Sequence, residues 1–389
     1  EKSSFVRYTD GMKIGIDTFA CKPGTSGVGV YLTQLIKRFP ASSDQYGLFG
    51  WDYDRFFYSD AAKNMDFIRQ GKIRGDTANL FWHIFKYPAF ARDCKFNACF
   101  FPAAHRRLPY NSPCPAVGTV HDMAAYWGTR KTREHLGALL RVILPNSLRR
   151  LDRIIAVSGW IKQELVDLIN IREAAIEVVP NGVDLNDFYP RKKTDESVVL
   201  IQPFSFKRPY ILYPARLEHP VKNHIRLIKA FEIFKARTKF PHRIVFAGSN
   251  SRGSDKIKEA AATSPCRADI FFTGTFPSKS LPELYSGADF VVIPSLYEGF
   301  GQSAIESMAC GVPVACARAA SLPETAEHAA LYFAPTDSED MADRMVSLAS
   351  DRALNKDLRQ AGLDRAKFFS WDACAAATQK IILETAGVV

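Results

Sequence analysis

The chain has 389 residues, of which 47% are hydrophobic and 24% charged, and a formal net charge of +10. This length exceeds one comfortable hydrophobic core and predicts two domains, and the composition excludes a disordered chain. No apolar run approaches the roughly 20 residues that span a bilayer, and the eight scattered cysteines, without a Cys-x-x-Cys pair, indicate reduced thiols rather than a zinc site.

The chain opens with a strand, a glycine-bearing loop and a helix. Residues 12–17 predict the strand, and the helix is expected from Leu32. Gly27 and Gly29 lie between them and suggest a dinucleotide fingerprint, but that pattern needs glycine at position 32. The first ten residues are polar and charged and lack the apolar run of a signal peptide, so we expect a cytoplasmic protein.

Two clusters in the next hundred residues have plain structural interpretations. Trp82, Phe85, Lys86 and Tyr87 group aromatic and basic side chains in a way that is more typical of a core than of a contact surface. The pair at residues 52–54 is the one Asp-x-Asp of the chain, and we interpret it as chance because it lies in an irregular aromatic stretch. We therefore expect no metal site.

Residues 115–120 read as a buried strand that ends in His121 and Asp122, at the edge where open α/β sheets place ligands. Residues 153–158 predict another strand, with Ser158 as the N-cap of a helix. The segment 176–184 follows as a strand and a turn. Strands that alternate with helices in this way predict a parallel sheet.

The densest basic region, residues 130–153, interleaves arginines with leucine, valine and isoleucine. Such a segment suits the surface of an anionic membrane, and it equally suits an amphipathic helix that packs on a sheet with solvated arginines. The net charge also admits nucleic acid, but we find no zinc-finger, RNP-type or bZIP pattern and expect no nucleic-acid partner.

A charged stretch without helical or strand period indicates a linker over residues 191–208, between a first domain of residues 1–190 and a second of residues 209–368. The second domain opens with a strand from Tyr210, followed by a loop that contains Arg216 and Lys222. Two further apolar strands each end at a glycine, Gly248 and Gly274, so we expect a doubly wound parallel sheet here too.

Residues 288–314 are the most informative part of the chain. They predict a buried strand, a glycine-bearing turn and a helix from Gln302, followed by the next strand. Glu298 precedes the helix and Glu306 lies inside it. A helix N-terminus at the carboxyl edge of a sheet suits a phosphate, and carboxylates suit sugar hydroxyls, so this unit predicts a nucleotide-sugar site.

The motif Glu298-Gly-Phe-Gly301, with a second glutamate at position 306, resembles the donor site of family 4 glycosyltransferases, which are retaining enzymes of the Glu-x7-Glu type with the GT-B fold. The earlier Pro-Asn-Gly-Val-Asp at residues 180–184 also resembles a segment that this family carries just before its interdomain linker. The resemblance implies an α/β protein with two Rossmann-like, doubly wound domains facing a cleft. The first would bind the acceptor, and a last helix at residues 369–389 would cross back to it.

The resemblance also implies roles for individual residues, although Ala215 stands where relatives often carry glycine. The catalytic set would be His121 near the donor sugar, Glu298 on that sugar, and Arg216 and Lys222 on the diphosphate. The donor-binding set would be Gly27 and Gly29, Gly274 and Thr275 at the base, the Phe300 and Gly301 peptides at the diphosphate, and Glu306 on the ribose.

These roles imply metal-independent transfer of a hexose from a nucleotide-diphosphate sugar, without a cofactor, by front-face substitution. The surroundings of Glu298 and residues 321–324 are similar to mannosyltransferases of surface-polysaccharide assembly, which favours GDP-mannose as donor and a glycan or polyprenyl-linked acceptor at the inner face of the membrane. Three alternatives stay open: a soluble disaccharide-type synthase using a UDP-sugar, a nucleotide-sugar epimerase of similar shape, and a non-catalytic binding protein. Acceptor, linkage and oligomeric state are also open.

Overall fold

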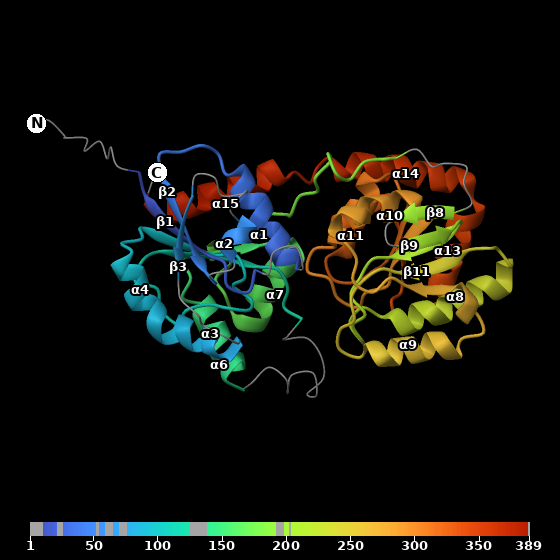
Figure 1. Ribbon diagram of the computed structural model, residues 1–389, viewed down its shortest axis with the longest axis horizontal. Coiled ribbons are helices and arrows are strands. Elements are labelled where there is room, and N and C mark those ends of the chain that lie inside the picture. Colours follow the sequence, from blue (N-terminus) through green and yellow to red (C-terminus); the bar gives the residue numbers. More distant parts are fainter. Residues whose placement is uncertain are drawn as a thin grey trace, which may run out of the picture. The chain divides into compact units, whose positions relative to one another are not determined.

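The computed structural model describes residues 11–21, 26–51, 54–58, 65–69, 76–124, 138–191, 198–201 and 204–387. The chain forms two compact units, one of Glu1–Gly182 together with Trp371–Val389 and the other of Val183–Ser370. Each unit has its own parallel sheet with helices packed on it (Figure 1). The two Rossmann-like domains expected from the sequence are therefore confirmed.

The first unit contains a seven-stranded sheet in the order β3-β2-β1-β4-β5-β6-β7, with every neighbouring pair parallel. The inner strands β1, β4, β5 and β6 are short apolar runs that are almost wholly buried, as expected when helices cover both faces. The strands of this sheet are β1 Lys13–Asp17, β2 Gln45–Gly50, β3 Met65–Arg69, β4 Ala98–Phe101, β5 Ala116–Val120, β6 Arg153–Ala156 and β7 Ile176–Val178.

The helices of this unit are α1 Gly27–Arg38, α2 Asp54–Tyr58, α3 Asp76–Phe81, the π-helical turn η1 Trp82–Lys86, α4 Tyr87–Asp93, α6 Ala138–Leu148, α7 Gly159–Ile169, the 3-10 turn η2 Glu173–Ala175 and α15 Trp371–Thr385. The expected N-cap of α7 is confirmed, because Ser158 Oγ accepts from the Ile161 N–H at 3.2 Å. Trp82 and Tyr87 are core residues as expected, but Phe85 is exposed, so the core interpretation is wrong for that ring.

The prediction that Gly27 and Gly29 lie in a loop before a helix that starts at Leu32 is wrong. Helix α1 begins at Gly27, so Gly27 and Gly29 form its first turn instead of a loop. The reason is local capping: extended Ser26 precedes the helix, and its Oγ accepts from the Gly29 N–H at 3.1 Å.

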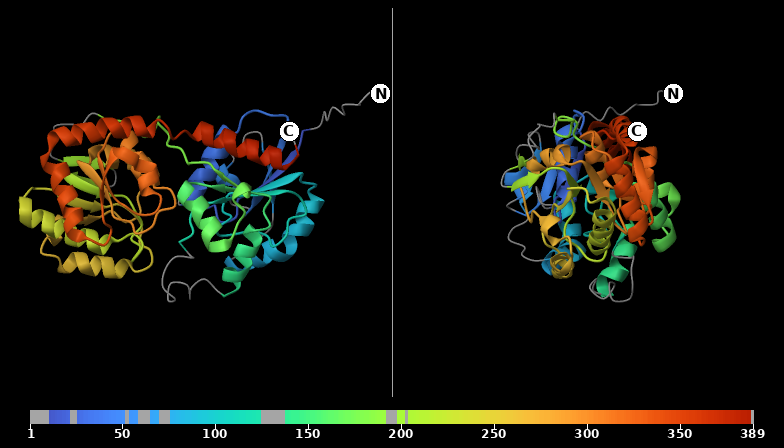
Figure 2. Two further views of the ribbon diagram at one scale, coloured as in Figure 1. Left: turned by 180° about the vertical axis from the view of Figure 1, so that it is seen from behind. Right: turned by 90° about the vertical axis from the view of Figure 1, so that its right-hand side faces the viewer.

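Helix α15 completes the core of the first unit, although it follows the whole second unit in sequence. It packs against α1, with the Trp371 ring 6.1 Å from the Tyr31 ring. Gln379 Nε2 donates to Pro40 O at 2.9 Å and to the Tyr46 hydroxyl at 2.6 Å. The left view of Figure 2 shows this red helix beside the blue, N-terminal part of the unit.

The second unit contains a six-stranded parallel sheet in the order β12-β11-β10-β13-β14-β15. The chain builds outward from β10 in one direction and then from β13 in the other, so the topological switch point lies between these two strands. The strands are β10 Tyr210–Tyr213, β11 Arg243–Phe246, β12 Ile270–Phe272, β13 Phe290–Ile293, β14 Val314–Ala317 and β15 Ala330–Phe333.

Its longer helices are α8 His224–Thr238, α9 Ser254–Thr263, α10 Leu281–Gly287, α11 Gln302–Ala309, α12 Leu322–Ala326, α13 Ser338–Ser350 and α14 Arg352–Ala366, and its 3-10 turns are Arg267–Asp269, Ser278–Ser280 and Glu327–Ala329. Right-handed crossovers put α8 and α9 on one face of the sheet and α10 and α11 on the other. Helix α13 packs on α8, and α14 packs on α11.

The segment expected as a linker, residues 191–208, contains secondary structure. Strands β8 Val198–Ile201 and β9 Phe204–Lys207 pair antiparallel as a hairpin, and this hairpin belongs to the second unit, which begins at Val183. The charged residues 192–197, on which the linker prediction depended, lie outside the described part. The apolar run of β8 carried a strand signal that the neighbouring charges obscured.

Candidate active site

The switch point of the second unit positions the residues expected to act on the donor. Arg216 and Lys222 follow β10, and Glu298 follows β13, the strand beside it. The connections after these two strands lead to opposite faces of the sheet, which opens a crevice at its carboxyl edge. The topology thus explains why residues 76 positions apart meet.

Lys222 and Glu298 form an ion pair in this crevice. Lys222 Nζ lies 2.6 Å from Glu298 Oε1, and the two side chains are only 18% and 16% exposed. The Ser295 hydroxyl donates to the same carboxylate oxygen at 2.7 Å. Tyr213 donates its hydroxyl hydrogen to Lys222 O at 2.9 Å and lies 2.9 Å from Ser295 Oγ. Contacts from Tyr213 at the end of β10 and from Ser295 just after β13 therefore hold the lysine and the glutamate in place.

Main-chain contacts fix the two loops that carry this pair. The Leu296 N–H donates to Val221 O at 2.9 Å, and the Ser321 hydroxyl donates to Glu298 O at 2.8 Å. Asn223, in the left-handed conformation at φ 57°, donates through Nδ2 to Pro294 O at 2.9 Å. The supporting roles of Ser295, Ser321 and Asn223 were not predicted from the sequence. Their signal is weak, because each is a small polar residue just beyond a strand end or beside a helix start.

The N-terminus of α11 follows Glu298 directly. Gly301 precedes the first helical residue with φ +93°, and a β-carbon there would lie 3.0 Å from Leu322 Cδ2. The Phe300 ring is buried and packs edge-on against Phe369 at 5.6 Å, while Thr325 Oγ1 donates to Phe300 O. The side chain of Phe300 thus anchors the turn at the N-terminus of α11, the kind of helix end at which anions bind.

Glu306 lies one turn into α11. Its carboxylate accepts from the Tyr285 hydroxyl at 2.9 Å. Burial raises the pKa of Glu306 from 4.5 to about 7, although the hydrogen bonds from Tyr285 and Gln302 act in the opposite direction. Near neutral pH this carboxyl group is therefore divided between a form that only accepts hydrogen bonds and one that can also donate.

The remaining predicted residues of the second unit lie apart from this ion pair. Arg216 is 59% exposed, and its nearest acidic partner is Glu218, at 3.1 Å. Gly274 and Thr275 follow β12, two strands from the switch point, at the same carboxyl edge. Gly274 has φ +65° with open space around its α-carbon. The structure therefore joins Lys222, Glu298 and the α11 N-terminus, and leaves the other three at the margin.

In the first unit, His121 comes directly after β5. Its Nε2 donates to Pro102 O at 2.9 Å, so Nδ1 carries the lone pair. The ring packs edge-on against Tyr31, with centroids 4.6 Å apart. Burial lowers the pKa of His121 to about 3. His121 is thus a neutral hydrogen-bond acceptor at any ordinary pH.

Gly27 and Gly29 follow β1, which neighbours the switch point of the first sheet, between β1 and β4. Gly27 is exposed, and a β-carbon there would meet nothing within 4 Å. Tyr31, in the same helix, is buried with its hydroxyl 3.1 Å from Thr119 Oγ1, so it is a core residue. The glycines accordingly present a helix N-terminus at a carboxyl edge.

Acidic and sulfur-bearing side chains show no metal-binding arrangement: within the described ranges, no three His, Cys, Asp or Glu residues are placed to hold an ion. Asp54, of the Asp-x-Asp pair, is buried and accepts from Thr18 Oγ1 at 2.7 Å and from the Trp51 N–H at 3.1 Å. That is a structural role. All eight cysteines are free thiols.

The basic region 130–153 is only partly described: residues 130–137 lie outside the described part, as do the side chains of residues 138–142. In the rest of α6, Leu144 and Leu148 are buried, and just after the helix Arg149 Nε donates to Ile169 O at 2.7 Å. These residues fit an amphipathic helix packed on its own unit. None of the described helices has the length and apolar character needed to cross a bilayer.

Family models match both halves of the chain. The model for Glycosyltransferase Family 4 matches residues 25–187, and the model for Glycosyl transferases group 1 matches residues 201–365. The two matched regions together cover most of the chain and contain every strand of the two parallel sheets except β1.

Among curated proteins, the O-antigen chain mannosyltransferase B of Escherichia coli is 28% identical over 68% of this chain and 68% of its own length. The serotype-specific mannosyltransferase WbdA of Escherichia coli is 26% identical over 67% of this chain but only 32% of its own length, so the present chain spans about a third of that protein. The D-inositol 3-phosphate glycosyltransferase of Corynebacterium jeikeium is 29% identical over 69% and 67% of the two chains.

Among solved structures, HepE of Anabaena, in complex with UDP and glucose, superposes with a TM-score of 0.72 at 19% identity over 97% of this chain and 100% of its own. The sucrose-phosphate synthase of Thermosynechococcus elongatus gives a TM-score of 0.71 at 18% identity over the same shares. These likenesses show the GT-B fold. Together with the family models and the mannosyltransferase relatives, they establish that the chain is a hexosyltransferase-type enzyme belonging to glycosyltransferase family 4.

Proposed function

We propose that the protein transfers a hexose, with retention and without a metal ion, from a nucleotide-diphosphate sugar to a glycan or lipid-linked acceptor in surface-polysaccharide assembly. The observation that carries the proposal is the Lys222–Glu298 pair at the switch point, next to the N-terminus of α11. One cation, one carboxylate and a row of N–H groups match the diphosphate and the sugar of such a donor.

In the proposed reaction the leaving group is a nucleoside diphosphate, whose negative charge grows as the glycosidic C–O bond breaks. Lys222 and the N–H groups at the start of α11 are fixed donors aimed at this charge, and exposed Arg216 can join them by a side-chain rotation. Deleting a fixed donor of this kind costs about 3 kcal/mol in the transition state of other enzymes. The protein would thus supply charge stabilisation that other transferases obtain from a metal ion.

Retention follows if the acceptor hydroxyl attacks from the side that the diphosphate leaves. A departing phosphate oxygen then takes the hydroxyl proton, and no protein nucleophile is needed. In the second unit, Glu298 would hold hydroxyls of the transferred sugar and Glu306 those of the ribose. In the first unit, His121 offers a neutral acceptor nitrogen for a sugar hydroxyl. Assay with an α-linked donor and NMR of the product linkage tests retention, because a β-linked product would exclude this mechanism.

The favoured donor is GDP-mannose, because one relative is named as an O-antigen chain mannosyltransferase and another as a serotype-specific mannosyltransferase. A thermal-shift screen of GDP-mannose, UDP-glucose and other nucleotide sugars tests this choice, since a ligand that binds only the folded state raises the melting temperature. We expect the largest shift, and transfer from the same donor, with GDP-mannose. The rate of transfer should be the same before and after the protein is treated with EDTA, because the proposed reaction needs no metal ion.

A second candidate is a soluble disaccharide-type synthase, favoured by the likeness to sucrose-phosphate synthase and by a mannosylfructose-phosphate synthase of Agrobacterium fabrum that is 26% identical over 58% of this chain. The two candidates differ in acceptor. Transfer to a free sugar phosphate, with none to a mannan oligosaccharide or a polyprenyl-linked sugar, would favour the synthase.

A further inference from the structure

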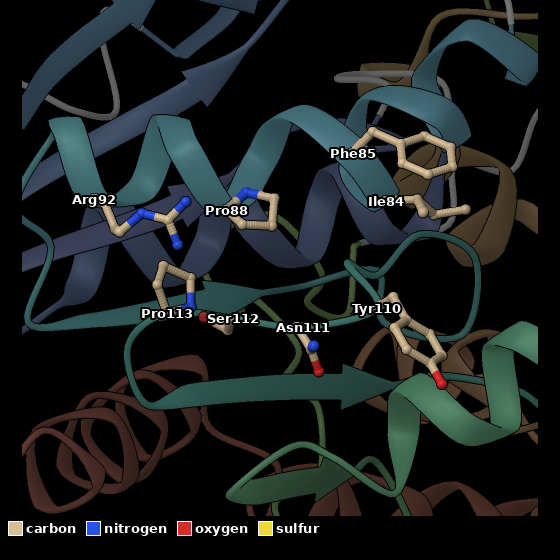
Figure 3. Close-up of a pocket in the computed structure, with 8 residues that line it drawn as sticks. All are labelled: Ile84, Phe85, Pro88, Arg92, Tyr110, Asn111, Ser112 and Pro113. Carbon is tan, nitrogen blue, oxygen red and sulfur yellow. The ribbon is translucent and has the colours of Figure 1, made fainter.

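A trough in the first unit lies outside the residues assigned to transfer. It is a cavity of about 470 Å³ between η1 and α4 on one side and the loop that precedes β5 on the other. Phe85, Pro88 and Arg92 line the helical side, and Tyr110, Asn111 and Pro113 line the loop side. Figure 3 shows Phe85 and Tyr110 at one end and Arg92 at the other.

The aromatic end presents two rings to solvent. Phe85 is 69% exposed and stacks with Phe81 at a centroid distance of 5.9 Å, and Tyr110 is 37% exposed. The Arg150 guanidinium lies over the Tyr110 ring at 4.1 Å. This contact fixes the plane of the tyrosine, so its ring is held in place before any ligand arrives.

Arg150 also orients the polar side chains of the loop through hydrogen bonds. Arg150 donates to Asn111 Oδ1 at 2.6 Å and to the Tyr110 hydroxyl at 3.0 Å. Both N–H bonds of Asn111 Nδ2 and the hydroxyl hydrogen of Tyr110 are thereby left to donate elsewhere. Arg92 is exposed, and no described residue accepts a hydrogen bond from its guanidinium. Asn111, Tyr110 and Arg92 therefore supply hydrogen-bond donors along the trough, and no carboxylate is among its lining residues.

We propose that this trough binds a segment of the acceptor glycan away from the point of transfer. A pyranose packs its C–H face on an aromatic ring, and its ring and hydroxyl oxygens accept from planar amide and guanidinium donors. The trough offers both features in fixed positions, at Phe85 and Tyr110 and at Asn111 and Arg92. The inference rests on the proposed function, since it assumes that the acceptor is a glycan chain.

The consequence is a preference for long acceptors. A chain held in the trough keeps its reactive end near the enzyme between transfers, which raises the effective concentration of that end. A disaccharide whose end is being extended has no further segment to place in the trough, so the trough does not raise its affinity.

Isothermal titration calorimetry tests the proposal, with α-mannobiose and long α-oligosaccharides prepared from mannan as the probes. We expect the wild-type protein to bind the long fragments at least about tenfold more tightly than mannobiose, a difference that corresponds to about 1.4 kcal/mol. Phe85→Ala and Asn111→Ala should each abolish this preference. Phe57→Ala, which removes another exposed ring, on α2 and outside the trough, should retain it.

Transfer to mannobiose is the second readout, and Phe85→Ala should leave its rate unchanged while shortening the products made from long acceptors. Equal affinities of wild type, Phe85→Ala and Asn111→Ala for the long fragments would overturn the proposal. So would a Phe85→Ala defect confined to phosphatidylglycerol vesicles, which would identify a lipid surface instead. Because calorimetry needs no turnover, a failure of transfer to any acceptor would sink the proposed function while the binding comparison still decides the trough.

Discussion

Lys222 Nζ and Glu298 Oε1 lie 2.6 Å apart at the ends of adjacent strands, so each neutralises the other within the crevice of the second unit. A bound diphosphate would compete for the lysine, and a bound sugar for the glutamate. The pair therefore keeps two charged groups oriented until a donor takes over both contacts.

Removing either member should reduce turnover strongly. We expect Lys222→Ala and Glu298→Gln each to lower kcat by about 10²- to 10³-fold, the usual effect of losing one fixed charge-stabilising group. Steady-state kinetics with the preferred donor measures it. Arg237→Ala serves as the control, because Arg237 forms exposed ion pairs with Glu339 and Asp343 on the same unit. Unchanged turnover in the Lys222 and Glu298 variants would contradict the site.

Glu306 should make both stability and donor binding depend on pH. Because burial raises its pKa from 4.5 to about 7, the folded protein binds this proton more tightly than the unfolded chain does. The stability that Glu306 contributes is complete below its unfolded pKa of 4.5 and is lost as the pH rises to about 7. Denaturant unfolding of wild type and Glu306→Gln at acidic and neutral pH should show this loss in the wild type only.

The Tyr285 hydroxyl lowers the pKa of Glu306, so its removal should shift the transition in donor KM to higher pH. Tyr285→Phe tests this in a pH series. Tyr210→Phe is the matched control, since Tyr210 is an equally buried tyrosine whose hydroxyl donates to Leu284 O. A shift of the same size in both variants would mean that the hydrogen bond to Glu306 is not responsible.

Two glycines of the second unit should respond differently to alanine. Gly301→Ala combines a positive φ with a β-carbon 3.0 Å from Leu322 Cδ2, whereas Gly274→Ala meets only the dihedral cost. The dihedral alone costs about 1–2 kcal/mol for a left-handed residue. We expect Gly301→Ala to lower the free energy of unfolding by more than Gly274→Ala does, and urea denaturation measures both. Equal losses would show that the helix start relaxes away from α12.

His121 should act without titrating. Its pKa of about 3 keeps the imidazole neutral, so it accepts a hydrogen bond but transfers no proton at working pH. His121→Asn should lower kcat/KM by a factor that is constant from acidic to alkaline pH. Profiles of rate against pH for the two proteins test this, and a defect that grows on one side of neutrality would assign proton transfer to His121 instead.

Local patterns explain what could be predicted from the sequence. The strand before Pro294, the helix after Gly301 and the spacing of Glu298 and Glu306 are all encoded within a few tens of residues. The supporting contacts are not local: Tyr213 and Ser295 are 82 positions apart, and Asn223 and Pro294 are 71 apart. Such pairs become visible only when the strand order is known. The low helix propensity of glycine predicts a loop at Gly27, but capping by Ser26 outweighs it and α1 begins there.

The return of α15 to the first unit makes that unit discontinuous, whereas the second is one unbroken segment, Val183–Ser370. During synthesis the second unit has all its residues before the first does, because Trp371 and Ile382 of the first core emerge last. The N-terminal sheet must therefore wait, with part of its apolar surface uncovered, until helix α15 has been synthesised. A premature stop after residue 370 would leave a complete C-terminal unit joined to an N-terminal one that lacks part of its core.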